Sequence, residues 1–219
     1  MSVRAVLLDL YDTLAWTEWP TLRRMLEERS GLSREQLLAA FDRTRHARSI
    51  GTYGSVEADL RAVLEAAGHR DEGRAGALAG LVSGFLEDGV HLWDDSIPLL
   101  RHLREREIST AVVSNCDHGT RPVVERLGLP EEVDAVVLSF EAGVAKPDPG
   151  IYLAALEALG SEPGDAAFVD DQIAYCDGAA ALGIRTFQIR RPQAAPIEGA
   201  GAAGTHTVIS DLRGLPDLL

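Results

Sequence analysis

Short apolar runs that end in polar residues recur in the two outer parts of the chain. The first covers residues 3–8 and leads directly into Asp9. A run of this length followed by turn-forming residues is typical of a buried parallel strand. Similar runs occupy residues 109–113, 135–138, 166–169, 185–189 and 207–209. Stretches with helical spacing lie between them, at residues 97–106, 121–127, 151–159 and 177–182. This alternation predicts an α/β fold with a doubly wound parallel sheet.

A long middle stretch, from Thr17 to about Gly89, is helical in texture throughout. Apolar residues recur there at three- and four-residue spacings, so that Leu37, Leu38 and Phe41 would share one helix face. Glycines divide the stretch into about four helices. We therefore predict an all-helical cap domain at residues 17–89, inserted into a Rossmann-like core formed by residues 1–16 and 90–219. Its two ends would lie near the binding crevice at the carboxyl ends of the strands, a position that suits a lid.

Charge and composition exclude some classes of partner. The chain has 34 acidic and 21 basic residues and a net charge of −13, which argues against a general nucleic-acid binder. No apolar stretch approaches the roughly 18 residues of a membrane span. The first residues lack the features of a signal peptide, so we expect a cytoplasmic protein. An acidic chain repels anionic substrates unless its site is locally positive, and a bound metal ion would supply such charge.

Acidic residues follow two of the predicted strands. Asp9 comes directly after the first, where desolvation of a carboxylate is costly unless it is compensated. Asp170 and Asp171 end the fourth, and a divalent cation would relieve the repulsion between them. Capping of the following helix is the simpler alternative for both positions.

Two further segments carry candidate chemistry. Ser114 and Asn115 close the second strand; they are ordinary turn residues, but a hydroxyl and a backbone N–H there could hold an anionic oxygen. Lys146 is the only lysine of the chain and precedes Pro147 and Pro149. The prolines fix the backbone, which favours a placed lysine over a solvated surface one.

Together, these four segments resemble, in order and spacing, the four motifs of the haloacid dehalogenase-like hydrolase superfamily, in the subclass with a helical cap between motifs one and two. The resemblance implies that Asp9 is a nucleophile that forms a covalent aspartyl intermediate, which water then hydrolyses. It implies that Lys146 offsets the negative charge around Asp9. It assigns catalytic roles to Asp9, Tyr11, Ser114 and Lys146, substrate binding to Ser114 and Asn115, and Mg²⁺ binding to Asp9, the Tyr11 carbonyl, Asp170 and Asp171.

The first motif departs from the pattern of the family's phosphatases. Those enzymes carry a second aspartate two residues after the nucleophile as general acid and base, and this chain has Tyr11 there. With tyrosine at this position, the first motif resembles that of the 2-haloacid dehalogenases, which use no metal. The fourth motif favours a phosphatase, because Tyr175 replaces the aspartate of the dehalogenases and the acidic pair suits Mg²⁺. Asp12 could replace the missing acid, although neighbouring side chains diverge in extended backbone.

Three functions are therefore open. The first is a Mg²⁺-dependent phosphatase that acts on a small phosphorylated metabolite, the second is a 2-haloacid dehalogenase, and the third is a weakly catalytic family member that binds a ligand or partner. The sequence names neither the substrate nor the oligomeric state.

Two clusters of side chains near the predicted cap have two interpretations each. Trp16, Trp19 and Trp93 would form either hinge packing or a pocket wall. Arg43, Arg45, His46 and Arg48 would either recognise the substrate or form a solvated helix face.

Overall fold

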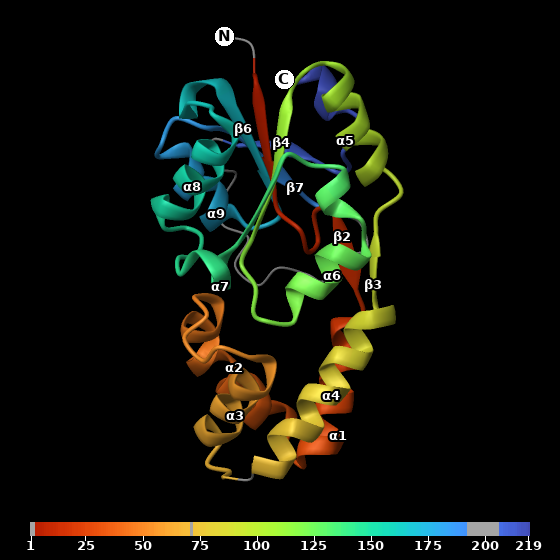
Figure 1. Ribbon diagram of the computed structural model, residues 1–219, viewed down its shortest axis with the longest axis vertical. Coiled ribbons are helices and arrows are strands. Elements are labelled where there is room, and N and C mark those ends of the chain that lie inside the picture. Colours follow the sequence, from red (N-terminus) through yellow and green to blue (C-terminus); the bar gives the residue numbers. More distant parts are fainter. Residues whose placement is uncertain (1–2, 71, 192–205) are drawn as a thin grey trace.

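The computed structural model describes residues 3–70, 72–191 and 206–219. A six-stranded sheet with the order β5-β4-β1-β6-β7-β8 forms the upper part of Figure 1. All of its strand pairs are parallel. The strands are β1 (Ala5–Leu8), β4 (Ser109–Ser114), β5 (Ala135–Leu138), β6 (Ala166–Asp170), β7 (Arg185–Ile189) and β8 (Thr207–Ile209). The predicted α/β fold with a parallel sheet is therefore confirmed.

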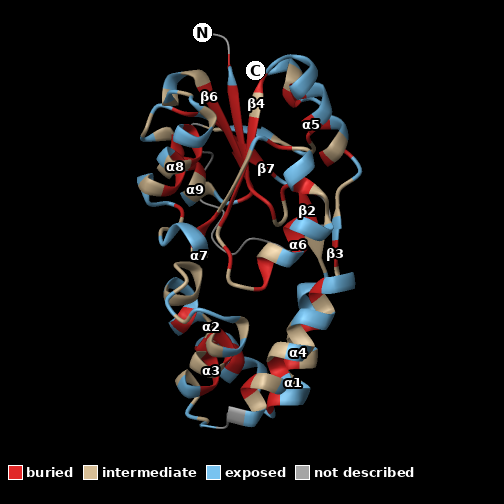
Figure 2. Cartoon of the chain, viewed as in Figure 1, coloured by how far each residue is buried: buried red, intermediate tan, exposed pale blue. Residues whose placement is uncertain are grey.

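Helices cover both faces of this sheet. Ala5 and Leu7 of β1 pack with α8, whereas Val6 and Leu8 pack with α5 on the opposite face. The helices of this part are α5 (Ser96–Glu105), α6 (Thr120–Arg126), α7 (Ser139–Ala142), α8 (Pro149–Leu159) and α9 (Ile173–Ala180), with 3₁₀ turns at Leu129–Glu131, Pro163–Asp165 and Leu215–Asp217. Because both faces are covered, the central strands are buried (Figure 2) and read as continuous apolar runs.

Four helices form the lower part of Figure 1, and we call them the helical insert. They are α1 (Trp19–Ser30), α2 (Arg34–Ser49), α3 (Val56–Ala66) and α4 (Glu72–Asp88). They pack around an apolar core of their own, which includes Leu26, Leu37 and Leu64. Leu38 does not join it: its side chain was expected on the inner face but is 46% exposed, because Leu37 and Ala40 occupy that face. The domain boundaries given above stay a prediction.

A two-stranded antiparallel ladder, which the sequence did not suggest, links the insert to the sheet. It pairs β2 (Ala15–Thr17) with β3 (Val90–Leu92), so the chain enters and leaves the insert side by side. Trp16 packs against His91 and Trp93, with ring centroids 4.8 and 6.1 Å apart. These two tryptophans therefore support the connection, as the hinge-packing interpretation expected.

Residues 192–204, which are rich in Ala, Gly and Pro and whose composition predicts a surface loop, lie outside the described residues. Within the described ranges, no helix combines the length and apolar character needed to cross a membrane.

Candidate active site

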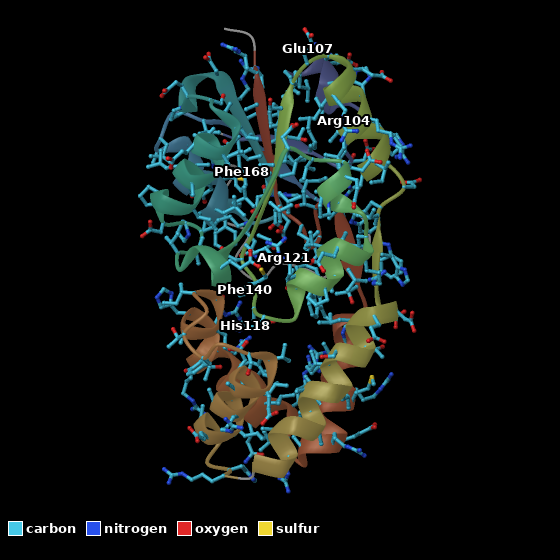
Figure 3. The ribbon with its side chains drawn as sticks, viewed as in Figure 1. Arg104, Glu107, His118, Arg121, Phe140 and Phe168 are labelled. Atoms are coloured by element: carbon cyan, nitrogen blue, oxygen red, sulfur yellow. The ribbon has the colours of Figure 1, made fainter. Side chains whose placement is uncertain are left out.

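A buried ion cluster lies at the carboxyl end of β1. Asp9 follows this strand directly, and its N–H donates to the carbonyl of Val169 on β6. The Lys146 ammonium lies 2.6 Å from Asp9 Oδ1 and 2.7 Å from Asp170 Oδ2. The ammonium also sits over the rings of Phe168, labelled in Figure 3, and Tyr175, at 5.5 and 5.1 Å from their centroids. The only lysine of the chain is therefore a fixed, buried counter-charge to two of the predicted site carboxylates.

The carboxylates outnumber the positive charge in this cluster. Asp9, Asp170 and Asp171 are all buried, and each offers an oxygen within 4.8 Å of the others. Burial raises the pKa of Asp9 to about 7 and, together with repulsion from Asp9 and Asp170, raises the pKa of Asp171 to about 9. Burial alone would lower the pKa of Lys146, but the two carboxylates beside it hold that pKa above its usual range.

These three carboxylates fit a divalent cation. They provide hard oxygen ligands in a compact group, and Lys146 supplies one positive charge against three negative ones. Mg²⁺ is bound in proteins through a few carboxylates of this kind. The role predicted for the Tyr11 carbonyl stays a prediction.

Ser114 and Asn115 lie beside this cluster but differ in their contacts. The buried Ser114 hydroxyl makes no hydrogen bond with any residue that the structure describes. A buried hydroxyl without a partner costs roughly 1–3 kcal/mol, so its partner is expected to be a ligand. Asn115 instead accepts a hydrogen bond from the Lys146 N–H at 2.7 Å and donates one to the Lys146 carbonyl at 2.8 Å. Its amide thus fixes the backbone of the lysine.

Tyr11 and Asp12 also face the cleft. The Tyr11 hydroxyl lies 3.4 Å from Thr120 Oγ1 and its ring 5.2 Å from that of Trp19, and burial holds its pKa above the usual range. Asp12 has a left-handed backbone with a φ of 60°, so the extended-backbone argument against it does not apply. Its carboxylate lines the cleft with Asp9, and burial raises its pKa.

A cleft of about 360 Å³ opens above the cluster between the sheet and the insert. Its sheet side includes Asp9, Ser114 and Lys146, and its insert side is formed by Trp19, Arg45, His46 and Ser49. Trp19 thus lines this cleft, whereas Trp16 and Trp93 are not among its lining residues. Ser49 and Gln172 were not identified from the sequence, because a polar residue on a helix or in a turn carries no signal that it faces a cleft.

The four basic residues in the second half of α2 separate into two pairs. Arg45 and His46 line the cleft, which favours the recognition interpretation for these two. Arg43 donates to the Ala66 carbonyl at 2.6 Å, and Arg48 donates to Asp117 at 2.9 Å. Arg43 and Arg48 therefore serve the fold of the insert and its contact with the core.

Comparisons with known proteins identify the family and leave its branches open. The family profile of the haloacid dehalogenase-like hydrolases matches residues 3–183. The human haloacid dehalogenase-like hydrolase domain-containing protein 3 is 37% identical over 127 residues, which are 55% of this chain and 50% of that protein. The match thus spans half the length of that relative. The (S)-2-haloacid dehalogenase 1 of Pseudomonas sp. (strain CBS-3) is 28% identical over 225 residues, 99% of this chain and 96% of that one.

Solved structures support the fold. The L-2-haloacid dehalogenase of Xanthobacter autotrophicus, with chloropropionic acid covalently bound, superposes with a TM-score of 0.69 at 20% identity and covers 99% of this chain and 98% of its own. Relatives of this chain include phosphatases as well as dehalogenases. The site combines a strand-end aspartate, a buried lysine and an acidic pair, and the family profile covers residues 3–183. This protein therefore belongs to the haloacid dehalogenase-like hydrolase family.

Proposed function

We propose that the protein is a Mg²⁺-dependent phosphatase of small phosphorylated metabolites, with Asp9 as its nucleophile. The observation that carries this proposal is the charge imbalance at the end of β1 and β6. One ammonium faces three buried carboxylates there, and Asp171 has no basic partner among the residues described. A metal-free dehalogenase could bind an anionic haloacid only with Asp171 protonated, because the ionised carboxylate would repel the haloacid.

The chain's own residues divide the chemistry between them. Lys146 holds one carboxylate oxygen of Asp9, which leaves the other to attack phosphorus. The new Asp9–phosphorus bond forms as the ester P–O bond breaks, and the alkoxide that leaves takes a proton. Water then attacks phosphorus, the bond to Asp9 breaks, and inorganic phosphate is released. The Ser114 hydroxyl is free to donate to a phosphoryl oxygen. A bound Mg²⁺ would neutralise the charge of the phosphoryl group.

Proton delivery to the leaving group falls to Asp12 or to solvent. The Tyr11 phenol is a poor proton exchanger, because its pKa lies above the usual range. Asp12 faces the cleft and has a raised pKa, so it is the better placed acid. Phosphate esters with good leaving groups need least help from either residue.

The test is release of phosphate from p-nitrophenyl phosphate and from a broad panel of phosphate esters in the presence of Mg²⁺. Turnover should disappear in Asp9→Asn, which keeps the shape of the side chain but not its nucleophilic oxygen. If the native protein does not exceed this variant on any ester, the phosphatase proposal fails.

A second candidate, a 2-haloacid dehalogenase, is favoured by Tyr11. In that reaction an Asp9 oxygen would attack C2 of the haloacid, the C–halogen bond would break and halide would leave, so no acid is needed for the leaving group. Chloride release from 2-chloropropionate in the presence of EDTA would support it. Strict dependence on Mg²⁺ would contradict it.

The missing acid at position 11 also favours a third candidate, a weakly catalytic family member that binds a ligand or partner. Unimpaired biological function in an Asp9→Ala variant would favour that alternative over both enzymes.

A further inference from the structure

We infer that Arg45 and His46 form an anion-binding subsite, so that the substrate is a small phosphate ester with a second anionic group on its leaving-group side. The inference rests on the proposed phosphatase function and adds a substrate class to it. It starts from the two basic residues of α2 that line the cleft.

The contacts of α2 separate the basic residues that hold the fold from those that face the cleft. Arg43 and Arg48 are bound to the insert and the core, as described above. Arg45 has only a 3.6 Å approach to Asp42 on the same helix, and the two side chains are 70% and 75% exposed. Such an exposed pair contributes little. The His46 imidazole has no hydrogen-bond or ion-pair partner in the described part of the chain, although it can donate.

Charge is distributed unevenly across the cleft. Asp9, Asp12 and Asp171 line its sheet side, and Arg45 and His46 line its insert side. Lys146 also lines the cleft, but two of its three ammonium protons already point to carboxylates. A second anionic group of the substrate would therefore meet repulsion near the sheet and attraction near α2.

The size and position of the cleft limit this substrate further. A volume of about 360 Å³ lies at the lower end of the range of small-molecule sites, about 300–1,000 Å³. Its phosphoryl group would lie at Asp9 and Ser114, and its tail would extend toward α2. The planar guanidinium of Arg45 presents parallel N–H donors that match a carboxylate or phosphate. The subsite would therefore orient the ester as well as add affinity.

The experiment compares pairs of phosphate esters in which one member carries a carboxylate and the other carries an uncharged group at the same position. The pairs are 3-phosphoglycerate with glycerol 3-phosphate, and phosphoglycolate with ethyl phosphate. Binding is measured by calorimetry in the Asp9→Asn background with Mg²⁺, and kcat and KM are measured in the native enzyme. We expect at least one carboxylate-bearing ester to bind more tightly than its partner without the carboxylate. Arg45→Ala should weaken binding of the carboxylate-bearing ester about tenfold, the loss of one charge-assisted contact. Binding of the partner without the carboxylate should change less than about twofold.

Matched variants separate charge from general damage to α2. Arg43→Ala removes the same side chain from the same helix outside the cleft and should leave the preference unchanged. Arg45→Lys should restore part of it, and Arg45→Glu should reverse it. His46→Gln should weaken binding of the anionic ester less than Arg45→Ala does.

The two proposals fail in different ways. Equal binding of charged and neutral esters by the native side chains, or equal loss in Arg45→Ala and Arg43→Ala, overturns the subsite even if phosphate is released. A preference that depends on Arg45, without phosphate release from any ester, supports the subsite and overturns the phosphatase function.

Discussion

Asn115 lines the cleft, and its contacts add a positioning role to the substrate binding predicted for it. The resemblance implied substrate binding, yet its amide bonds both to the N–H and to the carbonyl of Lys146. We expect Asn115→Ala to displace the lysine, to lower kcat at least tenfold, and to destabilise the fold by about 1–3 kcal/mol. Asn115→Asp keeps the acceptor but loses the donor, so its stability should lie between those of the native protein and Asn115→Ala.

Two readouts distinguish positioning from substrate contact at Asn115. Denaturant unfolding without substrate reports the loss of the Lys146 bonds directly. KM reports a contact with the substrate. A variant with native stability and only a raised KM would contradict the positioning role.

Tyr11 and Asp12 differ in what they can give to a leaving group. The Tyr11 hydroxyl has one long contact, 3.4 Å, with Thr120. We expect Tyr11→Phe to keep kcat within about threefold, because a bond of that length contributes less than a full hydrogen bond. Asp12→Asn keeps the left-handed backbone, which asparagine tolerates. It should slow alkyl phosphates about a hundredfold, the usual scale of general acid catalysis, and p-nitrophenyl phosphate much less. Larger losses in Tyr11→Phe than in Asp12→Asn would reverse the assignment.

Much of the candidate site followed from the sequence because it depends on strand ends. Asp9 and Asp170 lie where buried apolar runs stop, and parallel strands bring their carboxyl ends to one edge. Lys146 followed from its prolines. The two hydrogen bonds of Asn115 and the turn of Asp12 into the cleft did not, because both depend on backbone geometry in loops. Those loops carry no periodic pattern.

At the scale of elements, the junction between α2 and the core decides where the insert sits. Arg48 of α2 pairs with Asp117 at 2.9 Å, and Asp59 of α3 contacts His118 at 2.8 Å. His118 also packs on Phe140, at 4.8 Å between ring centroids, and both lie where the insert meets the core (Figure 3). The loop after Ser114 is thereby tied to α3 and to α2, which carries Arg45 and His46.

Gly51, just after α2, lies against the backbone of Phe140 at this junction. A Cβ there would collide with the Phe140 carbonyl, whereas a Cβ on Gly54 would meet nothing within 4 Å. Both glycines have positive φ, 73° and 83°, so an alanine strains the backbone at either site. We expect Gly51→Ala to displace the insert and to lower kcat/KM at least tenfold more than Gly54→Ala does. Equal effects of the two variants would show that backbone strain alone matters.

The fold was more predictable for long elements than for short ones. The four helices of the insert follow from their spacing and from the glycines between them. The ladder of β2 and β3 has three residues in each strand, too few for an alternation to stand out, and Trp16 and His91 gave no period. Leu38 shows the same limit on one face, since the period of a helix does not state which of two adjacent leucines turns inward.

At the scale of the whole molecule, the buried carboxylates make stability depend on pH and on metal. The raised pKa values of Asp9, about 7, and Asp171, about 9, mean that the folded protein keeps protons that the unfolded chain releases near pH 4. The stability that protonated Asp9 and Asp171 contribute is fully present below about pH 4 and is lost as the pH rises through their folded-state pKa values. In EDTA, we therefore expect the free energy of unfolding to decline from about pH 5 to pH 9.

Mg²⁺ should reverse this decline, because a bound cation favours the deprotonated carboxylates. At a concentration of 100 times its Kd it would stabilise the fold by about 2.7 kcal/mol. The rise in melting temperature should be larger at pH 8 than at pH 5, since protons compete with the metal at the lower pH. Asp171→Asn removes the cost of keeping Asp171 protonated in the folded state, so it should melt higher than the native protein in EDTA at pH 8 and respond little to Mg²⁺. Ca²⁺, which is larger, serves as the control ion. If Mg²⁺ leaves the melting temperature of the native protein unchanged at pH 8, the carboxylates do not hold the metal, and the metal-free dehalogenase becomes the better function.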